Sequence, residues 1–184
     1  MAVIGLLAAV LIPTTTAARI AARRAKTKVQ FSQWTVAMDL FRQEYGYYPA
    51  IDGGNGGKVL PEVFAGALTG QALSGSASPT ASQLAGNVRR LRFYHIGEGE
   101  LNDSRTELAD GFGNTDIAVI YDKNADGVVD SADGVVRGVH GLDGITDWTP
   151  ASRELDLAVG VRAGVIFYSA GNGRAPGDLV FSWK

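Results

Sequence analysis

The chain has 184 residues, no cysteine and a formal net charge of −2 at pH 7. This length suits one domain with an extended helix attached to it. The lack of cysteine excludes disulfides, thiolate zinc sites and cysteine nucleophiles. No sustained basic patch lies beyond the N-terminal region, which argues against a nucleic-acid-binding domain.

The N-terminal segment begins with an apolar run. Residues 1–12 carry no charge, and Pro13 ends the run. As a helix, residues 1–13 would rise about 20 Å, which is less than the roughly 30 Å hydrocarbon core of a bilayer. Pro13 has no N–H group and should weaken the helix locally. A basic cluster follows, formed by Arg19, Arg23, Arg24, Lys26 and Lys28.

A second apolar pattern predicts that the same helix continues. Its side chains recur at steps of three and four residues, which is the spacing of one helix face: Phe31, Trp34, Met38, Phe41 and Tyr45. Gly46 and Pro49 supply a stop signal after them. We therefore expect one long helix whose first half suits a hydrocarbon environment and whose second half packs on its own domain.

The middle of the chain gives weaker signals. Pro61 can occupy the first turn of a short helix over residues 60–73, although Gly70 interrupts this segment. Residues 73–86 are rich in Ser, Ala and Gly, and we expect them to form an exposed loop. The alternating pattern of residues 91–96 predicts a strand.

The strongest chemical signal is the acidic stretch from Asp122 to Asp133. Its oxygen-bearing residues match positions 1, 3, 5, 7, 9 and 12 of a twelve-residue calcium loop, with a backbone carbonyl at position 7. Gly127 falls at position 6, where the sharp turn needs a residue that tolerates positive φ. The predicted ligands of one Ca²⁺ are Asp122, Asn124, Asp126, Val128, Asp130 and Asp133.

The charge of this stretch favours a bound cation. Four carboxylates between residues 122 and 133 repel one another, so a hard divalent ion is their natural counter-charge. The alternative is a solvated acidic turn without an ion. A single loop of this kind, between the apolar segments 118–121 and 135–136, is typical of a structural role rather than a sensor. Aspartate at position 12 makes it resemble the calcium loop of dockerins.

Motifs of known enzyme classes are missing from the sequence. It has two histidines, His95 and His140, and no Gly-x-Ser-x-Gly, phosphate-binding loop or His-Glu-x-x-His pattern. A glycine-rich surface turn explains the neighbouring carboxylates Glu98, Glu100 and Asp103 more simply than a catalytic pair does. We therefore expect that the protein is not an enzyme and has no small-molecule substrate.

The N-terminal residues resemble a known family. The apolar residues 5–13, the Arg- and Lys-rich helix after them and the Tyr-Gly-Tyr-Tyr-Pro stretch at 45–49 are similar to the N-terminal helix of type IV pilin-like proteins. This family includes type IV pilins and the pseudopilins of type II secretion systems. Its members carry a basic leader that is cut before a Phe-Thr-Leu-Ile-Glu segment. We expect these residues upstream of Met1, where they would extend the apolar run to bilayer length.

The C-terminal half resembles the major pseudopilin. The similar segments are a turn, two strands and a closing segment: 110–114, 117–121, 165–171 and 178–183. In that subfamily, acidic residues of the last loop hold calcium. The corresponding residues 172–178 have Asp178 as their one carboxylate and also carry Arg174, which would oppose a cation. We therefore expect the calcium ion at residues 122–133 instead.

These observations predict an α+β fold: a long N-terminal helix packed on a small, mainly antiparallel sheet with long loops. Residues 1–49 would form the membrane and filament-core helix, and residues 50–184 the globular head. The resemblance implies a structural subunit of a type II secretion pseudopilus or a type IV pilus. Its partners would be further copies of this chain and other pilin-like subunits. The alternative is an exported, monomeric calcium-binding adhesion or docking module.

The same resemblance implies a place in the cell. The N-terminal helix would cross the bacterial inner membrane once, and the head would lie in the periplasm or outside the cell. Assembly would move the helix from the membrane into the core of the filament.

Overall fold

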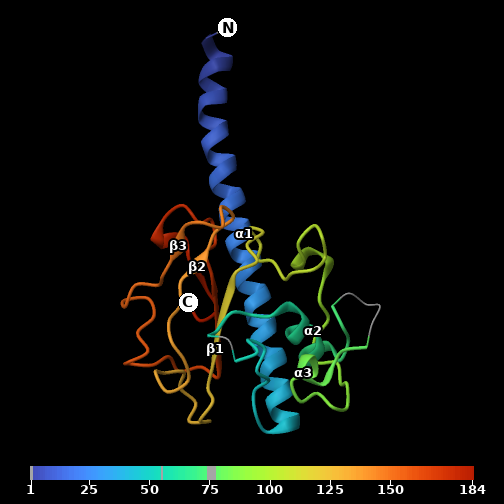
Figure 1. The fold of residues 1–184 in the computed structure, drawn as a ribbon. Coiled ribbons are helices and arrows are strands. Elements are labelled where there is room, and N and C mark those ends of the chain that lie inside the picture. Colours follow the sequence, from blue (N-terminus) through green and yellow to red (C-terminus); the bar gives the residue numbers. More distant parts are fainter. Residues whose placement is uncertain (1, 55, 74–77) are drawn as a thin grey trace.

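A computed structural model describes residues 2–54, 56–73 and 78–184, with side chains described except at residues 2–14 and 176. One long helix, α1 (Ala2–Tyr45), passes through the head and extends far beyond it (Figure 1). The sheet of the head has three strands in the antiparallel order β1-β4-β5, where β1 is Ile117–Tyr121, β4 is Val165–Ser169 and β5 is Val180–Phe181. The predicted α+β fold is confirmed.

Short elements complete the head. Two helices, α2 (Pro61–Thr69) and α3 (Ala81–Leu84), lie beside the second half of α1 (Figure 1). A small hairpin pairs β2 (Val139–His140) with β3 (Asp147–Trp148). Single 3₁₀ turns form at η1 (Glu98–Glu100) and η2 (Pro176–Asp178). Long loops join these elements, as predicted.

The three-stranded sheet is buried on both faces. Every residue of β1 and β4 is buried, which explains why both strands read as continuous apolar runs rather than alternating ones. Along β1, Ile117, Val119 and Tyr121 belong to the core that includes α1 and α2. Ala118 and Ile120 belong to a second core, which the β2–β3 region and the loops before and after it cover. The sheet is therefore the middle layer of the head.

The aromatic face of α1 forms the main core. Phe31, Trp34 and Phe41 are all 0% exposed. The Trp34 ring lies with its centroid 4.7 Å from that of Phe64 on α2 and 5.5 Å from that of Phe167 on β4. The spacing that predicted one apolar helix face thus places these rings between α2 and the sheet.

Polar contacts fix the height of α1 relative to the head. The hydroxyl of Thr27 accepts a hydrogen bond from the backbone N–H of Gly111 at 2.9 Å, and the amide of Gln30 donates to the Ala109 carbonyl at 2.9 Å. A β-carbon at Gly111 would lie 2.6 Å from the carbonyl oxygen of Arg23, so the turn at residues 110–114 needs glycine there. This turn therefore serves to dock the helix.

Helix α1 continues through Pro13. The backbone is helical on both sides of this residue, so the expected local weakening does not interrupt the helix. Within the described residues, no helix has the length and apolar character needed to cross a membrane. The apolar run at residues 1–12 lies outside the residues whose side chains are described.

Two predictions for residues 60–86 need correction. Helix α2 ends at Thr69 and does not reach residue 73, because Gly70 adopts a left-handed conformation with φ +70° and closes the helix. A β-carbon there would lie 2.6 Å from the Arg90 carbonyl oxygen. Residues 73–86 are not all loop, since α3 forms within them. Its capping box joins Thr80 and Gln83, each side chain accepting from the other's backbone N–H.

The strand predicted at residues 91–96 is wrong. The backbone N–H groups of Phe93 and Tyr94 both donate to the Leu68 carbonyl, at 2.8 and 2.9 Å, so the segment follows α2 instead of joining the sheet. The Phe93 ring lies 5.5 Å from that of Phe41 on α1. The alternating pattern therefore reflects side chains packed against two helices.

A buried carboxylate anchors the β2–β3 hairpin to the sheet. Asp116, directly before β1, accepts two hydrogen bonds from the Arg137 guanidinium, at 2.8 and 3.1 Å. It also accepts from the backbone N–H of His140 at 2.9 Å. Burial acts to raise the pKa of Asp116, but the hydrogen bonds from Arg137 and His140 outweigh it and hold the pKa below its ordinary value.

The aromatic core predicts a clear contrast between neighbouring residues of α1. Phe41→Ala should lower the free energy of unfolding by about 3–5 kcal/mol, because it opens a cavity in the fully buried core. Leu40 is 42% exposed, and Leu40→Ala should cost less than about 1 kcal/mol. Urea denaturation of both variants measures the difference. Equal losses would contradict the described packing.

The lowered pKa of Asp116 predicts a pH dependence with a definite sign. A depressed carboxyl pKa stabilises the fold above the unfolded-state pKa of about 3.9, and this contribution is lost as the pH falls through the lower folded-state value. Asp116→Asn should therefore cost about 1–3 kcal/mol at pH 7 and show a shallower loss of stability below about pH 4. Urea denaturation across pH 2.5–7 tests this, and identical acid slopes would refute it.

Candidate metal centre

The predicted calcium loop lies at the end of β1. The backbone N–H of Asp122 donates to the Gly164 carbonyl at 2.9 Å, which continues the pairing of β1 with the start of β4. Val129, at loop position 8, exchanges two backbone hydrogen bonds with Val161, at 2.8 and 2.9 Å. One neighbouring segment, residues 161–164, thus holds the loop at Asp122 and at Val129.

The first half of the loop folds around its own side chains. The Asp122 carboxylate accepts from the backbone N–H of Asp126 at 3.2 Å and of Gly127 at 2.9 Å. Asn124 also accepts from the Asp126 N–H, at 3.0 Å. Two residues adopt positive φ, Ala125 at +64° and Gly127 at +85°. Gly127, at position 6, therefore has the positive φ that the predicted sharp turn requires.

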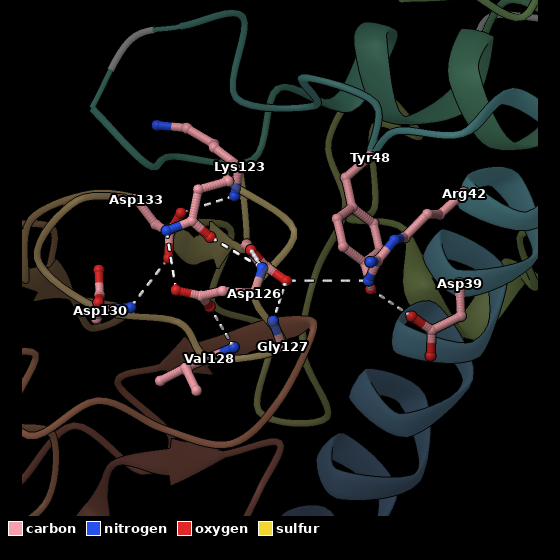
Figure 2. A network of polar contacts seen from close by, with 11 residues as sticks. Asp39, Arg42, Tyr48, Lys123, Asp126, Gly127, Val128, Asp130 and Asp133 are labelled. Carbon is pink, nitrogen blue, oxygen red and sulfur yellow. Dashed lines mark hydrogen bonds and ion pairs between the residues drawn. The ribbon is translucent and has the colours of Figure 1, made fainter.

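The second half closes the loop onto its beginning. The two oxygens of Asp133 accept from the backbone N–H of Lys123 at 2.7 Å and of Asp130 at 3.0 Å (Figure 2). Asp126 accepts from the N–H of Val128 at 2.8 Å. Position 12 is thereby tied to position 2, and the ends of the loop lie side by side.

Two of the predicted ligands are deeply buried. Asp122 is 3% exposed and Asp133 is 1% exposed. By contrast, the amide Asn124 at position 3 and the carboxylate Asp126 at position 5 are exposed. Among the described residues, Arg42 is the one basic side chain that forms an ion pair with a carboxylate of the loop. The loop therefore carries an excess of negative charge, part of it inside the head.

The donor set fits a hard cation in kind. Carboxylate, amide and backbone carbonyl oxygens are the ligands that Ca²⁺ prefers, and an ionised carboxylate that accepts two N–H groups retains further lone pairs. Within the described residues, however, no three Asp, Glu or His side chains gather as a metal-binding group. The carboxylates are turned toward backbone N–H groups of the loop. Binding of an ion would need them to shift toward a common point.

Helix α1 contacts the loop through a residue that sequence reasoning missed. The Arg42 guanidinium lies 3.9 Å from the Asp122 carboxylate and donates to the Tyr48 hydroxyl at 3.1 Å. That hydroxyl donates to Asp39 at 2.8 Å (Figure 2). The hydrogen bond to Tyr48 and the nearby carboxylates raise the pKa of Arg42 above its ordinary value. The helical spacing of Asp39 and Arg42 was readable, but nothing local linked them to residue 122.

The C-terminal loop has a different construction. Asp178 accepts from the backbone N–H groups of Arg174 at 3.1 Å and Ala175 at 3.2 Å, and from the Asn172 amide at 3.4 Å. These contacts close the single turn η2. They give the one carboxylate of residues 172–178 its hydrogen-bond partners.

Comparisons with protein-family models, with curated proteins and with solved structures found no match to this chain. The pilin-like resemblance therefore rests on the N-terminal helix, the turn at residues 110–114 and the C-terminal segments.

Calcium titration calorimetry distinguishes the two candidate loops, because substitutions in each should affect calcium binding differently. Asp122→Ala should abolish calcium binding, because it removes a buried ligand. Asp126→Ala should do the same while sparing the core, since Asp126 is exposed. Asp178→Ala should leave the stoichiometry unchanged. Loss of a site in the Asp178 variant, with binding retained in both others, would assign the ion to the C-terminal loop.

Proposed function

We propose that this protein is a structural subunit of a helical, pilus-like filament that is assembled through α1 and stabilised by calcium at residues 122–133. A type II secretion pseudopilus and a type IV pilus both fit this proposal. Before assembly, the apolar start of α1 would be held in the bacterial inner membrane, and the head would face the periplasm.

The observation that carries the proposal is the surface of α1. Inside the head, the helix turns its aromatic face toward the core. Its other side presents Val29, Val36 and Leu40, which are 58%, 56% and 42% exposed. Their spacing of seven and four residues aligns them on one face, and residues 15–19 before them are exposed as well. Helix α1 thus has an aromatic face inside its own head and three exposed apolar side chains on the opposite side, where a neighbouring subunit would contact it.

The length of α1 supports the same arrangement. The helix continues well beyond the head, so that its N-terminal part extends away from the sheet (Figure 1). Isolated helical segments gain little stability in water, and most of their stability comes from packing. In a filament, the α1 helices of neighbouring copies would supply this packing.

Calcium would act on the head. The ion would offset the negative charge of the loop, in which buried Asp133 has backbone N–H partners but, within the described residues, no ion pair. A ligand that binds the folded state alone stabilises it by mass action. The loop would thereby be stiffened against neighbouring heads and against proteolysis.

The assembly role predicts that the first half of α1 is needed for filaments but not for the fold. A version lacking residues 1–22 should stay folded, because it keeps Arg24, which donates to the Gly177 and Leu179 carbonyls, and the whole aromatic face. It should be monomeric, whereas the full chain should form filaments visible by electron microscopy. Ordered filaments of the shortened version would rule out this assembly.

A pair of surface substitutions in the full chain sharpens this test. Val36→Glu should prevent assembly with a change in stability within about 0.5 kcal/mol, since Val36 is 56% exposed. Val159→Glu changes an apolar side chain that is 82% exposed and lies outside α1, and it should leave assembly intact. A full chain that remains monomeric under all conditions would favour the alternative of a calcium-binding adhesion module.

A further inference from the structure

Helix α1 contacts the acidic loop through one buried carboxylate, Asp122, and one partly exposed guanidinium, Arg42. Asp122 has a side chain that is 0% exposed, and the Arg42 side chain is 34% exposed. The guanidinium lies 3.9 Å from the carboxylate oxygen that also accepts from the Gly127 N–H. The buried carboxylate is therefore balanced by a charge that belongs to the helix and not to the loop.

The position of the guanidinium is set by the end of α1. It lies 5.0 Å from the centroid of the Tyr48 ring and bonds to the hydroxyl of the same residue. Tyr48 is in turn fixed by its hydrogen bond to Asp39 on the helix (Figure 2). Asp39, Arg42 and Tyr48 thus form a chain of contacts that leads from α1 to the first position of the loop.

A crevice lies beside this contact. It has a volume of about 140 Å³ and lies between the last turn of α1 and the loop, with Arg42, Tyr48, Asp122 and Ala125 among its lining residues. The Arg42 side of its contact with Asp122 therefore borders open space.

The positive charge of Arg42 has opposite effects on the loop without and with a bound cation. Without an ion, the guanidinium offsets the buried carboxylate of Asp122 and stabilises the loop. With a divalent cation bound, the same positive charge repels it. The ion and the helix therefore compete for one carboxylate.

We propose that Arg42 is a helix-borne counter-charge that lowers the calcium affinity of the loop and couples ion binding to the docking of the end of α1. This inference rests on the proposed calcium site. Coupling between two sites is reciprocal. If a bound ion weakens the Arg42–Asp122 contact, that contact must weaken the binding of the ion by the same factor. Calcium would then loosen the junction between helix and head at the point where α1 ends.

A charge series at residue 42, in the full chain in detergent, tests the proposal by calcium titration calorimetry. Arg42→Lys keeps the charge and should leave Kd within about twofold of the unchanged protein. Arg42→Gln should lower Kd roughly three- to tenfold, and Arg42→Glu should lower it further. Arg89→Gln is the matched control, because Arg89 pairs with Glu44 of α1 and, among the described residues, forms no ion pair with the loop.

Thermal unfolding separates this role from a merely structural one. Without calcium, Arg42→Gln should melt below the unchanged protein, since the buried carboxylate has lost its counter-charge. At saturating calcium the difference should shrink, because the ion replaces that charge. A structural contact alone would give the same difference in both conditions.

The outcomes of these measurements are distinguishable. Failure of the unchanged protein to bind calcium would overturn the calcium site itself and the present inference with it. Calcium binding by the unchanged protein, with an equal or weaker affinity in Arg42→Gln, would overturn the role of Arg42 alone. A fall in Kd that follows the order Lys, Gln, Glu would support it.

Discussion

The packing of the aromatic face of α1 between α2 and the sheet is the contact on which the rest of the head depends. Phe31, Trp34 and Phe41 are fully buried, and rings from α2 and β4 close around them. Within the described residues the sheet has three strands, of which β5 is only two residues long, and the β1–β4 pair would be marginally stable without packing against a helix. The helix supplies the apolar surface that the sheet lacks, which makes the head and the second half of α1 a single folding unit.

Predictions from sequence succeeded where one short segment contains the whole signal. The 3.6-residue spacing identified the inner face of α1, and the apolar run at 117–121 became β1 residue for residue. They failed where a distant segment decides the outcome. Residues 91–96 pack on α2 instead of joining the sheet. Gly70 ends α2 in a left-handed conformation, and the nearby Arg90 backbone leaves no room there for a β-carbon. The capping box at Thr80 and Gln83 was local and could have been recognised.

The same division applies to the candidate metal centre. The positions of Asp122, Gly127 and Asp133 could be assigned from spacing alone, because all three lie in one continuous loop. The structure adds that the two end carboxylates are buried, a property that depends on the neighbouring segment 161–164. Arg42 lies 80 residues before Asp122 in the chain. Its contact with Asp122 follows from the way in which α1 packs on the sheet, and local sequence contains no trace of it.

These two constraints meet at the end of α1. The apolar face of the helix fixes where Arg42 lies, and β1 fixes where Asp122 lies, so the core sets the distance between the two charges. A change in packing along α1 would therefore move Arg42 and alter its contact with Asp122. A change in the charge of the loop would act on α1 through the same contact. In a filament whose subunits touch through α1, that contact would link the helical core to the outer surface of the heads.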